Sequence, residues 1–170
     1  MPKFLLQRCG DDSIESFQAA ANVRFADGVE AARAERRTAS IYLLGYAAEM
    51  LIKAAYFTAI GFSRTQVIQF GDLNDARNRA ILPPYNITWP NVGKFHNVRA
   101  WCDYLVAYRS HSPGIPYADP GFGGEIKRRG LQIEPIWRET LRYHNNLAYP
   151  HEVERMRSAV AWLVRHSLDL

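Results

Sequence analysis

The stretch ASIYLLGYAAEMLIKAAYFTAI, residues 39–60, decides how this chain folds. At 100° per residue, its apolar side chains cover one helical face and continue around the back. The remaining polar stripe is narrow and consists of Tyr42, Tyr46, Glu49 and Lys53. A helix that is apolar on nearly every side must be covered by several neighbours. The stretch therefore predicts the central helix of a bundle.

A lipid bilayer is the alternative way to bury such a helix, because the run is about long enough to span one. Glu49 and Lys53 lie in mid-run, however, and each charge would cost about 2.5–3.5 kcal/mol at the centre of a membrane-spanning helix. Their i, i+4 spacing, glutamate first, favours an ion pair along the helix. We therefore expect no membrane contact. The stripe is either the lining of a polar site or a buried pair that fixes the register of the bundle.

Apolar periodicity and capping signals predict further helices on both sides of this one. The expected helices cover residues 14–34, 39–60, 64–70, 73–81, 94–109, 125–130, 135–144 and the chain from Pro150 onward. Residues 61–94 contain Pro83-Pro84 and Trp89-Pro90, which force extended backbone. The sequence predicts a single all-α domain over residues 1–170. We expect a helical bundle of four to five main helices, with irregular backbone after the second helix.

The charge is concentrated near the end of the chain. The formal net charge is +4, and residues 127–166 contain eight Lys and Arg against four Glu, which equals the whole excess. Such a bias raises the expectation of a polyanionic partner. Lys127, Arg128 and Arg129 are the densest part of this segment.

The spacing of cysteine and histidine residues and the N-terminal sequence bear on metal binding and on cellular location. Cys9 and Cys102 lack partners at metal-ligand spacing, and no two histidines have the i, i+4 spacing of a helical metal site, so we expect no metal and no cofactor. The N-terminal apolar run is too short for the core of a signal peptide, which favours a cytoplasmic location.

Residues 136–151, IWRETLRYHNNLAYPH, collect arginine, histidine, tyrosine and asparagine between two expected helices. Histidine exchanges protons near neutral pH, and an arginine fork stabilises charge on a phosphoryl group. The set therefore suits metal-independent phosphodiester chemistry. The alternative is structural: Trp137 and Tyr143 belong to the core, and Arg138 and Arg142 pair with Glu134 and Glu139.

Several of these stretches are similar to one family. RFADG (24–28), ASIYLLGYAAEMLIKA (39–54), HNVRAW (96–101) and the segment from Trp137 to Tyr143 resemble the HEPN superfamily, the higher eukaryotes and prokaryotes nucleotide-binding domains. The resemblance covers roughly residues 14–60 and 95–166. It implies an up-and-down helical bundle, with residues 61–94 as an irregular insertion after the second helix. It also implies that the bundle forms a homodimer and works with RNA or a nucleotide. A toxin–antitoxin or defence system with a nucleotidyltransferase-like partner protein is the setting it implies.

The resemblance also implies site residues. Many relatives are metal-independent RNases with an Arg-x4–6-His motif, and Arg138 and His144 have that spacing. In that interpretation His144 is the general acid or base, and Arg138 and Arg142 steady the phosphorane. The candidate nucleic-acid or nucleotide contacts are Arg142, Tyr143, Lys127, Arg128, Arg129 and His151. The alternative function is a non-catalytic helical module that binds a protein partner.

Overall fold

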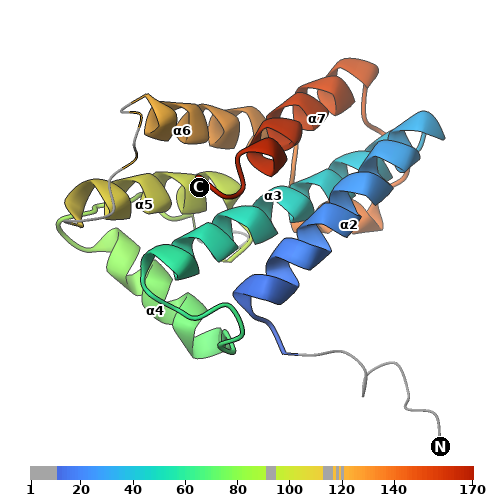
Figure 1. Ribbon diagram of the computed structural model, residues 1–170. Coiled ribbons are helices and arrows are strands. Elements are labelled where there is room, and N and C mark those ends of the chain that lie inside the picture. Colours follow the sequence, from blue (N-terminus) through green and yellow to red (C-terminus); the bar gives the residue numbers. More distant parts are fainter. Residues whose placement is uncertain (1–10, 91–94, 113–116, 118, 120) are drawn as a thin grey trace, which may run out of the picture.

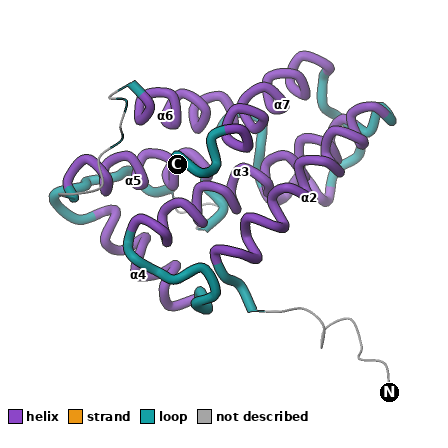
Figure 2. Tube along the Cα trace, in the orientation of Figure 1, coloured by secondary structure: helices purple, strands orange, loops and turns teal. Residues whose placement is uncertain are grey.

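The computed structural model describes residues 11–90, 95–112, 117, 119 and 121–170, and these residues form a bundle of helices (Figure 1). The elements are α2 (Ile14–Arg33), α3 (Arg37–Ala59), α4 (Phe70–Ile81), α5 (Val98–His111), α6 (Phe122–Ile133), the 3₁₀-helix η1 (Glu139–Tyr143) and α7 (Pro150–Arg165). Helices and connecting loops account for the whole described part of the chain, which contains no strand (Figure 2). The all-α bundle is confirmed.

Helix α3 is the centre of the bundle, as its sequence predicts. It packs against α2, α5 and α7, while α6 packs on α5 and α7 (Figure 1). Most of its residues are buried, including both charged members of the stripe, Glu49 and Lys53. It ends where expected, because Gly61 takes the left-handed conformation, φ +92°, that glycine tolerates. In the described part of the chain, no helix combines the length and the apolar character needed to cross a membrane.

Helices α2 and α3 form a helical hairpin. Ser13 caps α2, since its side chain accepts a hydrogen bond from the backbone of Ser16. Close approach of the two helices depends on Gly28, where a Cβ atom would lie 2.8 Å from Cγ of Leu44. The Ser40 hydroxyl donates to the Gly28 carbonyl at 2.7 Å and fastens the pair.

Residues 61–90 differ from the prediction, and the last residues of the expected insertion, 91–94, lie outside the described residues. The helix expected over 64–70 is wrong, because the backbone there bonds to the start of α2 instead: the amide of Ile68 donates to the carbonyl of Asp12, and that of Glu15 donates to the carbonyl of Arg64. The helix expected over 73–81 begins earlier, at Phe70. It starts there because Gln69 and Asp72 form a capping box.

In the second half of the chain, the helices begin and end at residues other than those that the sequence predicts. Helix α5 starts later than expected, because the Asn97 side chain caps it by accepting from the Ala100 amide at 2.7 Å. Helix α6 is longer than the predicted 125–130. Gly130 lets it approach α5, since a Cβ atom there would lie 3.1 Å from Cβ of Cys102. The helix expected over 135–144 is wrong in type, since only a 3₁₀-helix over Glu139–Tyr143 forms.

Candidate functional site

The polar stripe of α3 contains a buried cluster of three ionisable groups. Lys53 Nζ lies 2.5 Å from Glu49 Oε1, and both side chains are almost fully buried. The Nδ1 atom of His96, which precedes α5 by two residues, lies 3.0 Å from Glu49 Oε2 and 3.1 Å from Oε1. The pairing of Glu49 with Lys53 that the sequence predicts is therefore present, together with a third member.

This cluster keeps Glu49 ionised. Burial alone would raise the pKa of the Glu49 carboxyl, but the lysine charge and the histidine contact outweigh it, so the pKa is lowered. The lysine also lies 5.6 Å from the ring centroid of Trp101, a cation–π distance. The ring of His96 therefore contacts a negatively charged, buried carboxylate through its Nδ1 atom.

Two tyrosines continue the stripe toward the start of α3. The ring of Tyr46 lies 6.0 Å from that of His96 and 5.0 Å from that of Tyr42. Burial, followed by the hydrogen bond to Tyr42, raises the pKa of Tyr46, so its phenol stays protonated. Both tyrosines, with Arg24, Leu43 and Met50, line a hollow of about 390 Å³, which is within the size range of small-ligand sites.

Trp137 brings the segment after α6 onto this stripe. Its indole is buried, donates to the carbonyl of Tyr42 at 3.2 Å and packs edge-on against Tyr46 at 5.5 Å. It lies directly on Gly45, where a Cβ atom would come 2.0 Å from the indole ring. Trp137 is therefore a core residue, as the structural interpretation expects, but that interpretation is wrong for Tyr143, which is 73% exposed.

Arg142, on η1, adds a basic side chain near Tyr42, at the opposite end of the stripe from Glu49 and Lys53. It is exposed, its guanidinium carbon lies 4.7 Å from the ring centroid of Tyr143, and the nearby phenols of Tyr143 and Tyr42 raise its pKa. It forms no ion pair with a carboxylate in the described ranges, so the expected pairing with Glu139 is absent there. We name the row Arg142, Tyr42, Tyr46, His96 and Glu49 the polar row.

Arg138 and His144 lie at opposite ends of η1. At about 2.0 Å rise per residue, their Cα atoms are separated by roughly 12 Å along the helix axis. Arg138 donates to the carbonyls of Glu134 and Trp137 at 2.6 and 2.8 Å. The pairing of Arg138 with the Glu134 carboxylate is wrong, because that carboxylate binds Arg99 at 2.7 Å. His144 is exposed, and its backbone amide donates to the Leu141 carbonyl.

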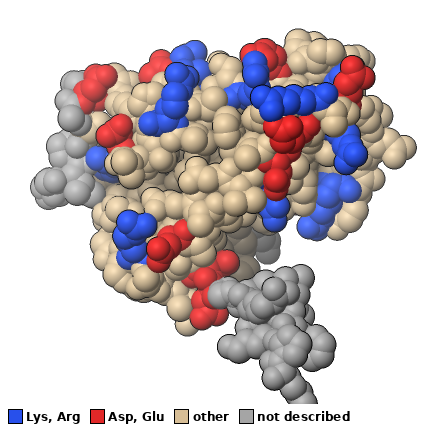
Figure 3. Space-filling view, turned by 45° about the vertical axis from the view of Figure 1, so that its right-hand side comes forward, with Lys and Arg blue, Asp and Glu red and all other residues tan. Residues whose placement is uncertain are grey.

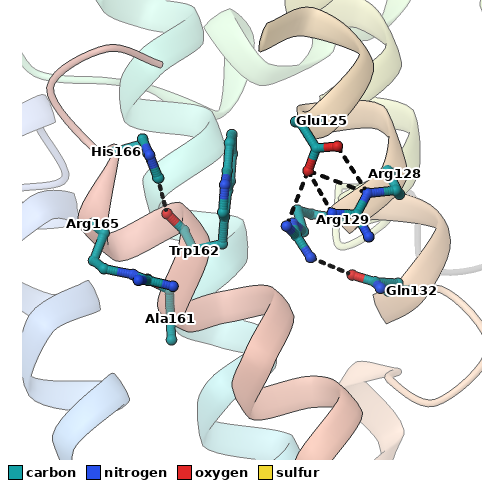
Figure 4. Close-up of polar contacts among 8 residues, drawn as sticks. All are labelled: Glu125, Arg128, Arg129, Gln132, Ala161, Trp162, Arg165 and His166. Atoms are coloured by element: carbon teal, nitrogen blue, oxygen red, sulfur yellow. Dashed lines mark hydrogen bonds and ion pairs between the residues drawn. The ribbon is translucent and has the colours of Figure 1, made fainter. Parts of the chain in front are cut away.

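The other predicted contact residues lie apart from the polar row. His151, on α7, stacks on Tyr149 with ring centroids 5.7 Å apart. On α6, Glu125 binds Arg128 at 2.6 Å and Arg129 at 3.0 Å, and Arg129 also reaches Gln132 (Figure 4). Lys127 is exposed on the same helix. Two of these three basic side chains therefore have a carboxylate partner already.

The distribution of charged side chains on the surface agrees with this pairing of basic and acidic residues. Basic and acidic side chains alternate on the face drawn in Figure 3 and do not form one continuous basic field. Near the end of α7, Arg165 and His166 direct their nitrogens to backbone carbonyls of Ala161 and Trp162 (Figure 4). The basic excess of residues 127–166 is thus largely used in local contacts.

His96 is the site residue that local sequence patterns do not reveal. It lies 47 positions from Glu49, and in the sequence only the HNVRAW stretch of the family resemblance contains it. The signal that points to it is Glu49 itself, because a carboxylate inside an apolar helix needs partners. Within the described ranges, no group of three His, Cys, Asp or Glu side chains has the arrangement of a metal site. Cys102 is a free, buried thiol whose pKa burial raises.

Comparison of the chain with family models, with curated proteins and with solved structures finds no match.

Proposed function

We propose that the chain is a HEPN-like domain that binds a nucleotide or a single-stranded RNA segment on the polar row. The observation that carries the proposal is Arg142. Its guanidinium is exposed, lacks a carboxylate partner in the described ranges and lies 4.7 Å from the ring centroid of Tyr143, and the nearby Tyr42 phenol also raises its pKa. An arginine fork binds a phosphate in bidentate fashion, and neighbouring aromatic rings stack on bases without sequence preference.

The hollow beside the row supports the same ligand. Tyr42 and Tyr46 line it, and so does Arg24, which pairs with Asp27 at 3.2 Å. The two rings pack edge to face with centroids 5.0 Å apart, so a flat heterocycle would stack over this pair and not between the rings, with its phosphate toward the arginine. The resemblance adds the setting: a toxin–antitoxin or defence system in the cytoplasm, a homodimer, and a nucleotidyltransferase-like partner protein.

The test compares two exposed arginines. Binding of a fluorescein-labelled single-stranded RNA and of AMP is measured by anisotropy and calorimetry for the wild type, Arg142→Ala and Arg157→Ala. Arg157 is the matched control, because it already pairs with Glu154 at 2.8 Å. A hydrogen bond to a charged group contributes about 1.5–3 kcal/mol, so Arg142→Ala should weaken binding by about 10- to 100-fold. Arg157→Ala should change it by less than about threefold.

Salt dependence gives a second readout of the same contact. Losing one phosphate contact lowers the slope of log affinity against log salt by about 1. Arg142→Ala should show this change and Arg157→Ala should not. Equal loss in both variants would mean that the phosphate binds elsewhere, for instance on α6.

One observation favours the second candidate, a protein-partner module. Tyr143, Leu147 and Tyr149 are 73%, 67% and 64% exposed along a single stretch of chain. Exposed aromatic and aliphatic side chains grouped in this way are typical of protein interfaces. Absence of RNA and nucleotide binding at low salt, together with capture of a specific protein that Tyr143→Ala abolishes, would support this candidate instead.

A further inference from the structure

A second hollow lies near the end of α3, away from the polar row. Its volume is about 360 Å³, which is within the size range of small-ligand sites. It is lined by the start of α2, the end of α3, Arg64, the end of α5 and residues that follow α7. Along α3, the thirteen positions from Tyr42 to Ala55 cover about 20 Å at 1.5 Å per residue, so this hollow is separate from the row.

The inner part of this hollow is apolar. Three of its lining residues, Ile14, Ala55 and Leu170, are 2%, 9% and 5% exposed. Space remains there because the last turns of α3 carry small side chains: Ala55 and Ala59 are four positions apart and share one helical face. Such a lining favours a ligand with an apolar body, since apolar surface gains free energy when it leaves water.

The outer part of the hollow carries a positive charge. The Arg64 side chain is 73% exposed, and the carbonyl of this residue accepts a hydrogen bond from the Glu15 amide at 3.0 Å, which holds it beside the first turn of α2. The guanidinium lies 4.0 Å from the carboxylate of Glu15, whose side chain is itself 58% exposed. An exposed pair of this kind contributes little, so the carboxylate of a ligand can take the place of Glu15.

Arg109 adds a second positive charge to the wall and shapes it. Its guanidinium donates to the main-chain oxygens of Asp169 and Leu170, and its guanidinium carbon lies 3.9 Å from the ring centroid of Tyr117. These contacts fasten the residues after α7 to α5. Among the described residues that line the hollow, two are arginines and none has a carboxylate side chain. The charge of the lining therefore favours an anionic ligand.

We infer that this hollow binds a small carboxylic acid with an apolar body. The apolar body lies against the alanine face of α3, and the carboxylate meets Arg64. A planar guanidinium suits this contact, because its fork of N–H groups matches the two oxygens of a carboxylate. The inference goes beyond the proposed function and does not rest on it, since it concerns another site and another ligand.

The probe is octanoate, and its binding to the full chain is measured by isothermal titration calorimetry. Burial of one methylene group should tighten binding about fourfold, so octanoate should bind about 16-fold more tightly than hexanoate. Octan-1-ol and octylamine have the same apolar chain with a neutral and a positive end. Octylamine should bind more weakly than both octanoate and octan-1-ol, because its ammonium group meets the arginines.

Substitutions at the outer part separate charge from apolar contact. Arg64→Gln should weaken octanoate binding about 10-fold, the lower end for a hydrogen bond to a charged group, and should leave the affinity for octan-1-ol unchanged. Glu15→Gln should strengthen octanoate binding by up to about fivefold, since it removes the competing carboxylate. Arg157→Gln is the matched control, because that arginine pairs with Glu154 on α7, and it should change the affinity by less than about twofold.

A substitution in the inner part tests the hollow itself. Ala59→Phe places a phenyl ring in the space and should abolish binding of octanoate and octan-1-ol alike. Ala19→Phe, at an exposed position of α2, is the matched control and should bind both as the wild type does. Circular dichroism shows whether each variant is folded. If Ala59→Phe unfolds, the exposed variant Arg64→Gln and the comparison of octanoate with octylamine still decide the matter.

The outcomes are distinct from those that test the proposed function. Octanoate binding that weakens in Arg64→Gln and disappears in Ala59→Phe would support the inference. Absence of octanoate binding at millimolar concentration would overturn it, as would equal affinity for octanoate and octylamine. Equal weakening in Arg64→Gln and Arg157→Gln, or binding that persists in folded Ala59→Phe, would also overturn it. None of these results changes the binding of RNA or a nucleotide at Arg142, so the two proposals fail separately.

Discussion

Glu49→Ala is the sharpest test of how the centre of the bundle is held together. The substitution leaves the Lys53 ammonium with a side chain only 7% exposed and removes its partner at 2.5 Å. The ring of Trp101, 5.6 Å away, cannot replace a carboxylate, and His96 loses its partner too. Breaking a buried pair by removing one member costs about 3–5 kcal/mol, so we expect a loss of that size.

Urea denaturation followed by circular dichroism at 222 nm measures this loss. A domain of this kind is stabilised by about 5–15 kcal/mol, so a variant that loses 3–5 remains folded enough for a transition to be fitted. The matched control is Glu49→Leu/Lys53→Met, which replaces both charges with apolar side chains of similar volume. Such replacements are often neutral or stabilising, so the double variant should be markedly more stable than Glu49→Ala.

Two results would refute the reasoning. A loss below about 0.5 kcal/mol for Glu49→Ala would mean that water reaches the stripe, as it does at an ordinary surface pair. A double variant as unstable as the single one would mean that the cost comes from packing and not from an uncompensated charge. The slope of free energy against urea should stay constant across the three proteins, since a change would indicate that two-state behaviour has been lost.

Three further predictions follow from the fold. Because the folded pKa of Glu49 lies below its unfolded value of about 4.3, its contribution to stability should be complete above that pH and should be lost as pH falls through the folded pKa; acid titration of Glu49→Gln should lack this component. Gly45→Ala should cost about 3 kcal/mol or more in urea, because its Cβ would lie 2.0 Å from the Trp137 indole, whereas Gly124→Ala on α6, with open space around it, should gain about 0.5–1 kcal/mol; equal effects would show that the indole moves aside freely. Finally, we expect a homodimer, so light scattering at roughly 20 µM should give twice the chain mass, and a monomer mass would remove any site shared between two copies.

The parts of the fold that depend on local signals could be predicted. The 39–60 stretch has an unmistakable helical period and a glycine stop at Gly61, and Pro150 suits the first turn of the last helix. The failures have tertiary causes. Trp137 packs on Gly45, and this contact prevents a continuous helix through 135–144. Backbone hydrogen bonds to the start of α2 keep residues 64–68 from forming a helix.

The site was less predictable than the fold. The stripe of α3 identified Glu49 as a buried acid, yet its third partner comes from another part of the chain, where no periodicity or spacing marks it. Arg142 was singled out for its composition, but the sequence paired it with Glu139 as readily as with a phosphate. Only the tertiary arrangement shows its contacts with tyrosines. Counting charges in the sequence also overstated the positive charge that α6 offers to a partner, since Arg128 and Arg129 share Glu125.

The segment that carries Arg142 is fastened at both ends, and this gives it the character of a fixed-length bridge. At one end Trp137 sits on Gly45; at the other, the Asn146 side chain accepts from the Thr38 amide at 3.1 Å. The bridge therefore runs antiparallel to residues 38–45 of α3, and the arginine at its middle meets Tyr42 at theirs. Length within it should matter more than composition. Removing a single residue between the two anchors would carry the arginine away from the row without touching the core, whereas most side-chain changes there would leave it in place.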